Sequence, residues 1–231
     1  MPKIRLKITK GEAVRYLAHL DFARAIERSI RRAKLPVAYS EGFNPHMKMA
    51  FASALGLGVT SDAEYMDIEL SRDMDVQQFQ QLLKGQLPEG IGLLIARDIL
   101  QQSPALMKVI NLATYLVRAP LVDTDFGRTS AAVEAFNSAK EVIYIKEMPK
   151  GRRQINVKTY MADAVEVVSW DGIVLQLRFA IHITPTGSVK PGEVLAALVN
   201  EFQLPVRAAS AVLHRTGLFV AGAERQEPIA R

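Results

Sequence analysis

The order in which strands and helices alternate along the chain is the feature that most restricts its fold. Residues 3–9 alternate charged and apolar side chains, and residues 20–34 repeat apolar side chains at helical spacing. A short strand over 49–54, a strand over 63–70, a helix over 76–86 and a strand over 91–100 are predicted to follow. This β-α-β-β-α-β order is that of the split βαβ, or ferredoxin-like, motif.

A similar order of elements begins again after a linker around residues 101–104. We expect a strand over 109–118, a helix over 129–139, strands over 141–147 and 154–158, a hairpin turning at Asp171-Gly172, a helix from Pro191 to Phe202 and a strand over 210–220. Asp-Gly is a strong two-residue hairpin turn, and proline suits the first turn of a helix. The sequence therefore predicts an α+β fold of two tandem ferredoxin-like modules with antiparallel sheets. The first spans residues 1–102, and the second spans 109–231 and contains an inserted hairpin.

Positive charge is concentrated at the N-terminal end. Residues 1–50 carry 11 Lys/Arg and 4 Asp/Glu, a net charge of +7, whereas the whole chain carries 29 and 24, a net charge of +5. A positive field confined to one region predicts an anionic partner there.

The helix predicted over 20–34 carries a stripe of arginines. Asp21 is its predicted N-cap, Pro36 ends it, and Phe22, Ile26 and Ile30 form its apolar face. Planar guanidinium groups suit phosphate binding, so four residues are candidates for binding a substrate: Arg24, Arg28, Arg31 and Arg32. An ordinary solvated helix face, partly paired with Glu27, is the alternative interpretation.

The segment after this helix combines aromatic, imidazole and ammonium groups within ten residues. Such groups can stack on bases and hold phosphates, which adds five candidates for the same substrate-binding face: Tyr39, Phe43, Asn44, His46 and Lys48. Asn44-Pro45 is also an ordinary turn dipeptide. Secondary basic candidates lie in the second half, in a predicted turn holding Lys150, Arg152 and Arg153, and at Arg215 in the last strand.

Catalytic and cofactor signals are sparse. His19 and His46 are candidate general acids or bases, but the four histidines have no metal-ligand spacing and no phosphate-loop or nucleophile motif occurs. The chain has no cysteine, so its own thiolates cannot hold an iron–sulfur cluster. We expect no metal and no cofactor. Without a signal peptide or an apolar stretch of about 18 residues, we also expect a cytoplasmic protein with no membrane partner.

Several stretches resemble the radical-SAM-linked family of domains of unknown function. They are GEAVRYLAHLD at 11–21, YSEGFNPHMKMAFASALGLGV at 39–59, EYMDIEL at 64–70, the basic turn at 150–153 and Arg-Thr-Gly at 215–217. Position 47 is methionine, where that family's pattern has proline. The resemblance implies an accessory or substrate-binding module that works with a radical SAM protein and is not itself the radical enzyme; we expect no catalytic activity from the chain alone, with an RNA-processing activity as the alternative.

Three functions remain open at this point. The first is a module that binds RNA or a ribonucleoprotein through the basic N-terminal face and presents it to a radical SAM partner. The second is a metal-independent RNA-processing enzyme that uses a histidine, and the third is a protein–protein adaptor. A nucleic-acid binder weakens steeply as salt rises, whereas an apolar adaptor does not.

Overall fold

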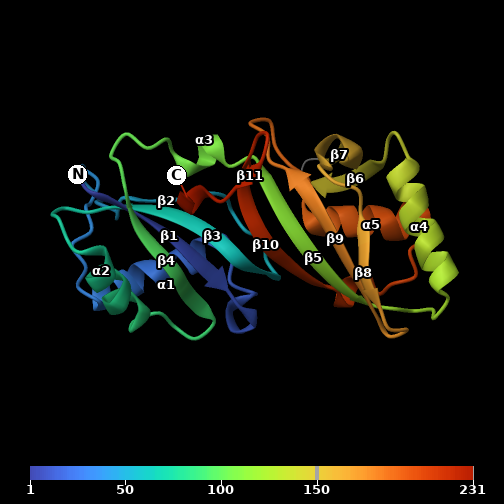
Figure 1. The fold of residues 1–231 in the computed structure, drawn as a ribbon, viewed down its shortest axis with the longest axis horizontal. Helices are drawn as coiled ribbons and strands as arrows, with labels where there is room; N and C mark the ends of the chain where they lie inside the picture. The colour runs from blue at the N-terminus through green and yellow to red at the C-terminus, as the bar shows by residue number, and fades with distance from the viewer. Residues whose placement is uncertain (149–150, 231) are drawn as a thin grey trace. The chain divides into compact units, whose positions relative to one another are not determined.

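The computed structural model describes residues 1–148 and 151–230, and the chain divides into two compact units (Figure 1). Unit 1 comprises Met1–Asn111 and Gly217–Arg231, and unit 2 comprises Leu112–Thr216. In both units helices accompany antiparallel strands, which confirms the predicted α+β class. No helix in the described part of the chain has the length and apolar character needed to cross a membrane.

Four strands of unit 1 pair with one another in antiparallel orientation. The elements of unit 1 in chain order are β1 (Lys3–Lys10), α1 (His19–Arg32), β2 (Met49–Phe51), β3 (Val59–Glu69), α2 (Val76–Lys84), β4 (Ile91–Ile99) and the short helix α3 (Leu106–Val109). A 3-10 turn, η1 (Glu12–Val14), precedes α1. The pairings place the strands in the order β4-β1-β3-β2. The predicted order of strands and helices is therefore present, although β3 begins before residue 63 and residues 106–109 are helical.

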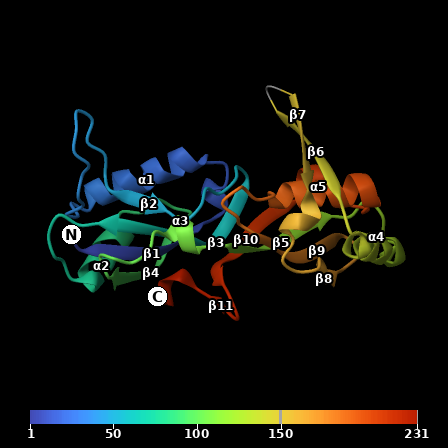
Figure 2. The same cartoon turned by 90° about the horizontal axis from the view of Figure 1, so that it is seen from above.

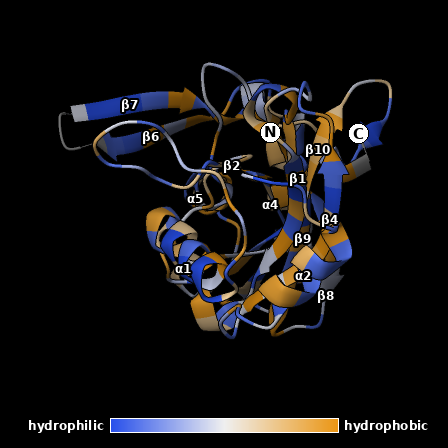
Figure 3. Ribbon diagram, turned by 90° about the vertical axis from the view of Figure 1, so that its left-hand side faces the viewer, coloured by the Kyte–Doolittle hydropathy of each residue, from blue (hydrophilic) through white to orange (hydrophobic). Residues whose placement is uncertain are grey.

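Side-chain alternation in β1 separates the two faces of this sheet. Ile4, Leu6 and Ile8 are at most 1% exposed and join a core that includes Phe22 of α1 and Phe79 of α2. Figure 3 shows both helices on the same side of β1 and β4. Because successive residues of a strand point to opposite faces, the intervening cationic side chains of β1 lie on the face away from α1.

Helix α1 begins two residues earlier than its predicted cap. Ala18 occupies the N-cap position with extended backbone angles, and Asp21 lies inside the first turn, so the prediction of an Asp21 cap was wrong. The carboxylate still interacts favourably with the positive end of the helix dipole. At the other end, Leu35 N–H donates to Ile30 O and Lys34 N–H donates to Arg31 O, which is the hydrogen-bond pattern of a Schellman motif.

Unit 2 repeats the alternation of strands and helices and has one extra β-hairpin. Its elements are β5 (Leu112–Pro120), α4 (Phe126–Ser138), β6 (Ile143–Met148), β7 (Gly151–Asn156), β8 (Glu166–Trp170), β9 (Val174–His182) and α5 (Pro191–Phe202), with 3-10 turns η2 (Val157–Tyr160) and η3 (Ala208–Ser210). Strands β5, β9 and β8 pair in that order, and the Asp171-Gly172 turn joins β8 to β9 as predicted. Strands β6 and β7 form a separate two-stranded sheet, which projects from unit 2 in Figure 2.

The C-terminal end of the chain returns to unit 1. The boundary between the units falls inside β10 (Val212–Ala221), which is followed by β11 (Arg225–Gln226) and the 3-10 turn η4 (Pro228–Ala230). Arg5 donates a hydrogen bond of 2.9 Å to Pro228 O, and Lys7 pairs with Glu227 at 2.7 Å. Residues 217–231 were predicted to belong to the second module, whereas these bonds to β1 attach them to unit 1.

Candidate nucleic-acid interface

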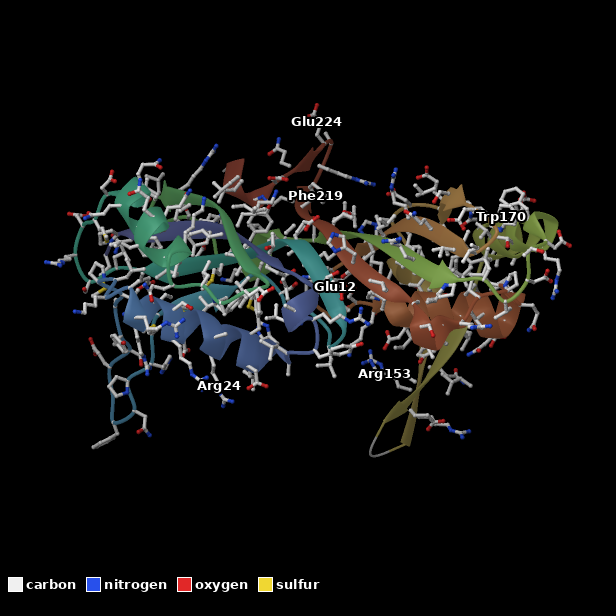
Figure 4. All side chains as sticks on the ribbon, turned by 90° about the horizontal axis from the view of Figure 1, so that it is seen from below. Glu12, Arg24, Arg153, Trp170, Phe219 and Glu224 are labelled. Atoms are coloured by element: carbon white, nitrogen blue, oxygen red, sulfur yellow. The ribbon has the colours of Figure 1, made fainter. Side chains whose placement is uncertain are left out.

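The predicted arginine stripe lies on the exposed side of α1, but its members have different partners. Arg24 is paired with Asp21 at 3.2 Å, and Figure 4 shows its side chain pointing away from the sheet. Arg32 donates to the carbonyl oxygen of Gln86 at 2.6 Å. Arg28 and Arg31 are exposed and make no ion pair with any described residue.

Ion pairing greatly reduces the area over which the N-terminal positive charge is available. Six of the eleven cations in residues 1–50 pair with carboxylates, namely Lys3, Arg5, Lys7, Arg15, Arg24 and Lys48. Lys10 is 1% exposed, and its ammonium donates to the carbonyl oxygens of Arg15 and Leu17. Burial lowers the pKa of Lys10, because the apolar surroundings disfavour its charged form.

Four exposed cations then remain without a carboxylate partner among the described residues: Arg28, Arg31, Arg32 and Lys34. We call these four residues the α1 cation cluster. They lie in the second half of α1 and directly after it, where positive charge also interacts favourably with the helix dipole. The available positive charge is therefore local and not spread over the N-terminal fifty residues.

The loop of residues 40–46 is closed by hydrogen bonds. Tyr39 and Met47 form an isolated antiparallel β-bridge, and Ser40 N–H donates to His46 O at 2.9 Å. The Ser40 hydroxyl lies 2.9 Å from His46 Nδ1 and accepts a bond of 3.1 Å from His46 N–H. Met47 is buried and anchors the base of the loop. In Figure 2 this light-blue loop stands away from the sheet of unit 1.

The tip of this loop presents an aromatic ring to solvent. Phe43 is fully exposed, and Gly42 beside it has a φ of +116°, a conformation that glycine adopts readily. Tyr39 is 44% exposed, while Asn44 is exposed at the tip. Because nothing covers the ring of Phe43, it contributes little to the core and is available for stacking.

Lys48, which follows the loop, forms an ion pair with a residue of β3 and does not join the loop's polar groups. Its ammonium lies 3.7 Å from Glu69, which also pairs with Lys3 at 3.2 Å. These groups line a pocket of about 340 Å³ together with Asp67 and Ser103. Since Lys3 and Asp67 alternate with residues of the helix-covered face, this pocket opens on the opposite face of the sheet.

The two candidate catalytic histidines have different surroundings. The His19 ring packs edge-on against Phe51 with its centroid at 5.1 Å, and His46 contacts Ser40 within the loop. Within the described residues no group of three or more histidine or acidic side chains is arranged to hold a metal. Acid–base catalysis by either histidine stays a prediction.

One buried ion pair was missed by the sequence analysis. Arg5 of β1 lies opposite Asp67 of β3 and makes two bonds to its carboxylate, of 2.7 and 2.9 Å. Both strands alternate charged residues on the same face, so Lys3, Arg5 and Lys7 face Glu69, Asp67 and Tyr65 in register. That complementary alternation was the available signal, because oppositely charged cross-strand neighbours stabilise a sheet.

The secondary basic candidates are dispersed. Arg215 is 4% exposed and donates to the Tyr115 hydroxyl at 3.2 Å, so it lies inside unit 2. Arg152 and Arg153 lie in strand β7 and not in the predicted turn, because the pairing of β6 with β7 continues to Gly151. Arg152 pairs with Glu147, while Arg153 is exposed on the hairpin (Figure 4). Lys150 lies outside the described residues.

Comparison with known proteins identifies a family and a fold similarity. A family model described as "Uncharacterized protein conserved in bacteria (DUF2344)" matches residues 3–191. No curated protein matches the chain.

Two solved structures have chains of similar fold. A chain of the archaeal box H/ACA sRNP Nop10-Cbf5 complex matches with 11% identity and a TM-score of 0.46, and covers 93% of this chain and 46% of its own. A chain of a Cbf5-Nop10-Gar1 complex matches with 11% identity and a TM-score of 0.50, with coverages of 93% and 48%. The present chain thus spans about half the length of these two chains. At this identity the similarity concerns the fold alone.

Proposed function

The chain belongs to the family of uncharacterized proteins conserved in bacteria (DUF2344). From its fold and its exposed charges we propose that it is a non-catalytic RNA-binding module built on two ferredoxin-like units. The strand order β4-β1-β3-β2 of unit 1, with antiparallel neighbours, supports the ferredoxin-like assignment. The resemblance of residues 11–70 to radical-SAM-linked domains supports a radical SAM protein as its partner.

The observation that carries the RNA proposal is the α1 cation cluster. Arg28 and Arg31 lie three residues apart, so they share one side of the helix, and neither is neutralised by a described carboxylate. Arginine suits phosphate because its planar guanidinium offers several donors in a fixed geometry. Phe43 supplies an exposed ring on which a base can stack without sequence preference. Together they provide the two contacts that single-stranded RNA binding requires.

Three matched helix variants test this proposal. The affinity of the full chain for a fluorescein-labelled single-stranded RNA is measured by anisotropy for Arg28→Ala, Arg31→Ala and Arg24→Ala. All three changes remove one charge from the same helix, but only Arg24 has a carboxylate partner, Asp21. We expect Arg28→Ala and Arg31→Ala to weaken binding more than Arg24→Ala. Equal effects of all three would show that only net charge matters and would contradict a specific phosphate contact.

The loop gives a second, independent test of the same function. Phe43→Ala should weaken RNA binding by about 1–3 kcal/mol, the range measured for stacking of one base on an aromatic side chain. Phe43→Tyr retains a ring and should bind like the native protein. The thermal midpoint should be the same for all three proteins, because the ring of Phe43 is fully exposed. Native affinity of Phe43→Ala would contradict stacking.

A protein–protein adaptor is the second candidate function, and the loop tip favours it. Residues 41–45 contain one carboxylate, Glu41, and no cation. A fully exposed phenylalanine beside a carboxylate is suited to an apolar pocket of a protein. In that case Phe43→Ala leaves RNA binding unchanged and weakens association with the protein partner.

A further inference from the structure

The pocket on the sheet face opposite α1 is not used by the proposed RNA-binding surface. It lies between the start of β1, strand β2, the end of β3 and the segment that leads into α3. Its volume of about 340 Å³ falls in the range of small-molecule sites. Its inner surface combines the apolar side chains of Ala50 and Ala105 with charged ones.

The charges in this pocket do not balance. Asp67 is already held by two bonds from Arg5, whose side chain is 3% exposed. Glu69 is the remaining carboxylate, and it faces two ammonium groups, Lys3 at 3.2 Å and Lys48 at 3.7 Å. Two cations against one carboxylate leave one positive charge in excess.

The two lysines remain accessible to a ligand. Their side chains are 23% and 35% exposed, and the longer 3.7 Å distance shows that Glu69 holds Lys48 loosely. Ser103 also lines the pocket, and its hydroxyl group can add a hydrogen bond to an anionic oxygen. Lysine also binds phosphate, as a compact point charge with three rotatable donors.

We infer that this pocket binds a phosphate monoester, with the phosphate held between Lys3 and Lys48 and a small organic group against Ala50 and Ala105. Glu69 keeps the two ammonium groups close together in the free protein and competes with the ligand for them. The phosphate can come from a free sugar phosphate or from the 5′ end of an RNA. The inference does not depend on the proposed function, because the pocket and α1 lie on opposite faces of the sheet.

Titration of the full ¹⁵N-labelled chain by NMR tests this inference. The probes are inorganic phosphate, ribose 5-phosphate, and one short RNA with and without its 5′-phosphate, each at constant ionic strength set with sodium chloride. We expect saturable shifts of the Ala50, Ser103 and Ala105 amide signals. Ribose 5-phosphate acting alone identifies a free ester as the ligand, and an effect of the RNA that requires its 5′-phosphate identifies the RNA end.

Three substitutions should change phosphate affinity in different ways, which distinguishes a specific site from general charge attraction. Lys48→Gln should weaken phosphate binding about tenfold, the loss expected for one charge-assisted hydrogen bond. Glu69→Gln should strengthen it, because the competing carboxylate is gone. Lys84→Gln, on the exposed last turn of α2, should have no effect. Shifts that do not saturate, equal effects of Lys48→Gln and Lys84→Gln, or weaker binding by Glu69→Gln would overturn the inference.

Discussion

Two ion pairs on the same pair of strands differ in burial and so in their expected contribution to stability. Arg5–Asp67 has side-chain exposures of 3% and 14%, whereas Lys3–Glu69 has 23% and 29%. Both pairs are directly opposite one another in the register of β1 and β3. Burial therefore distinguishes them more than position does.

We predict that Asp67→Ala lowers the free energy of unfolding by about 3–5 kcal/mol, because it leaves the buried guanidinium of Arg5 without a counter-charge. Glu69→Ala, the matched control, should cost no more than about 1 kcal/mol, as partly exposed pairs do. Urea denaturation measures both values. Similar losses for the two variants would contradict the account of Arg5 as a buried cation that depends on Asp67.

The Asp171 carboxylate provides a pH-dependent contribution to stability. Its Oδ1 accepts bonds from Val174 N–H at 2.7 Å and Ile173 N–H at 2.9 Å, and these bonds lower the pKa of Asp171 below its ordinary value of 3.8. A lowered folded-state pKa means that the stabilisation is present above pH 3.8 and is lost as the pH falls through the folded-state pKa. NMR titration of the side-chain carboxyl carbon should give a pKa below 3.8. A value at or above 3.8 would show that these bonds do not form in solution.

At the scale of elements, the end of α1 carries a residue in an unfavourable conformation. Lys34 occupies the C′ position of the Schellman motif with a φ of +52°, where glycine is the usual residue. Leu35 and Ile30, which the motif brings together, are both buried. Burial of these two side chains therefore maintains the motif, although a positive φ is unfavourable for lysine.

Lys34→Gly should raise the free energy of unfolding by about 0.5–1 kcal/mol, because glycine adopts positive φ without steric cost. Lys34→Ala removes the same charge but keeps the Cβ atom, so it should not give this gain. Thermal and urea unfolding of both variants measure the difference. A gain of equal size in Lys34→Ala would assign the effect to charge and not to backbone conformation.

Element type could be predicted from sequence where side-chain periodicity was strong. Ile4, Leu6 and Ile8 alternate in β1, and Phe22, Ile26 and Ile30 recur at helical spacing in α1, and all six residues are buried. The start of α1 could not be predicted, because Ala18 caps it through its backbone angles and has no capping side chain. The extension of β7 through Arg152 and Arg153 could not be predicted either, because it depends on pairing with β6.

At the scale of the whole chain, the positive charge of the N-terminal region could be counted but its availability could not. Arg5 is neutralised by a residue 62 positions away, and Lys7 by one 220 positions away. Only the folded chain shows that the α1 cation cluster is what remains. The same long-range pairing separates Lys48 from the loop to which its sequence position assigned it.

The return of the C-terminal residues to unit 1 gives a prediction at this scale. Deleting residues 222–231 removes the contacts of Arg5 with Pro228 O, of Lys7 with Glu227, and of Arg97 with Ile229 O. Hydrogen exchange should then become faster in β1 and β4. Strands β5 and β9 belong to unit 2 and serve as the internal control. Unchanged exchange in β1, or equal acceleration in β5, would contradict the assignment of this segment to unit 1.

The salt dependence of RNA binding tests the central claim most directly. For single-stranded RNA the slope of log K against log salt concentration is about −0.7 per phosphate contact. The native chain should show a slope that corresponds to several phosphate contacts. The slope of the Arg28→Ala/Arg31→Ala double variant should be shallower by about 1.4, the value for two contacts. The double variant should unfold at the native temperature, since both side chains are exposed. A slope near zero in the native chain, or an unchanged slope in the double variant, would contradict an RNA-binding role for the α1 cation cluster.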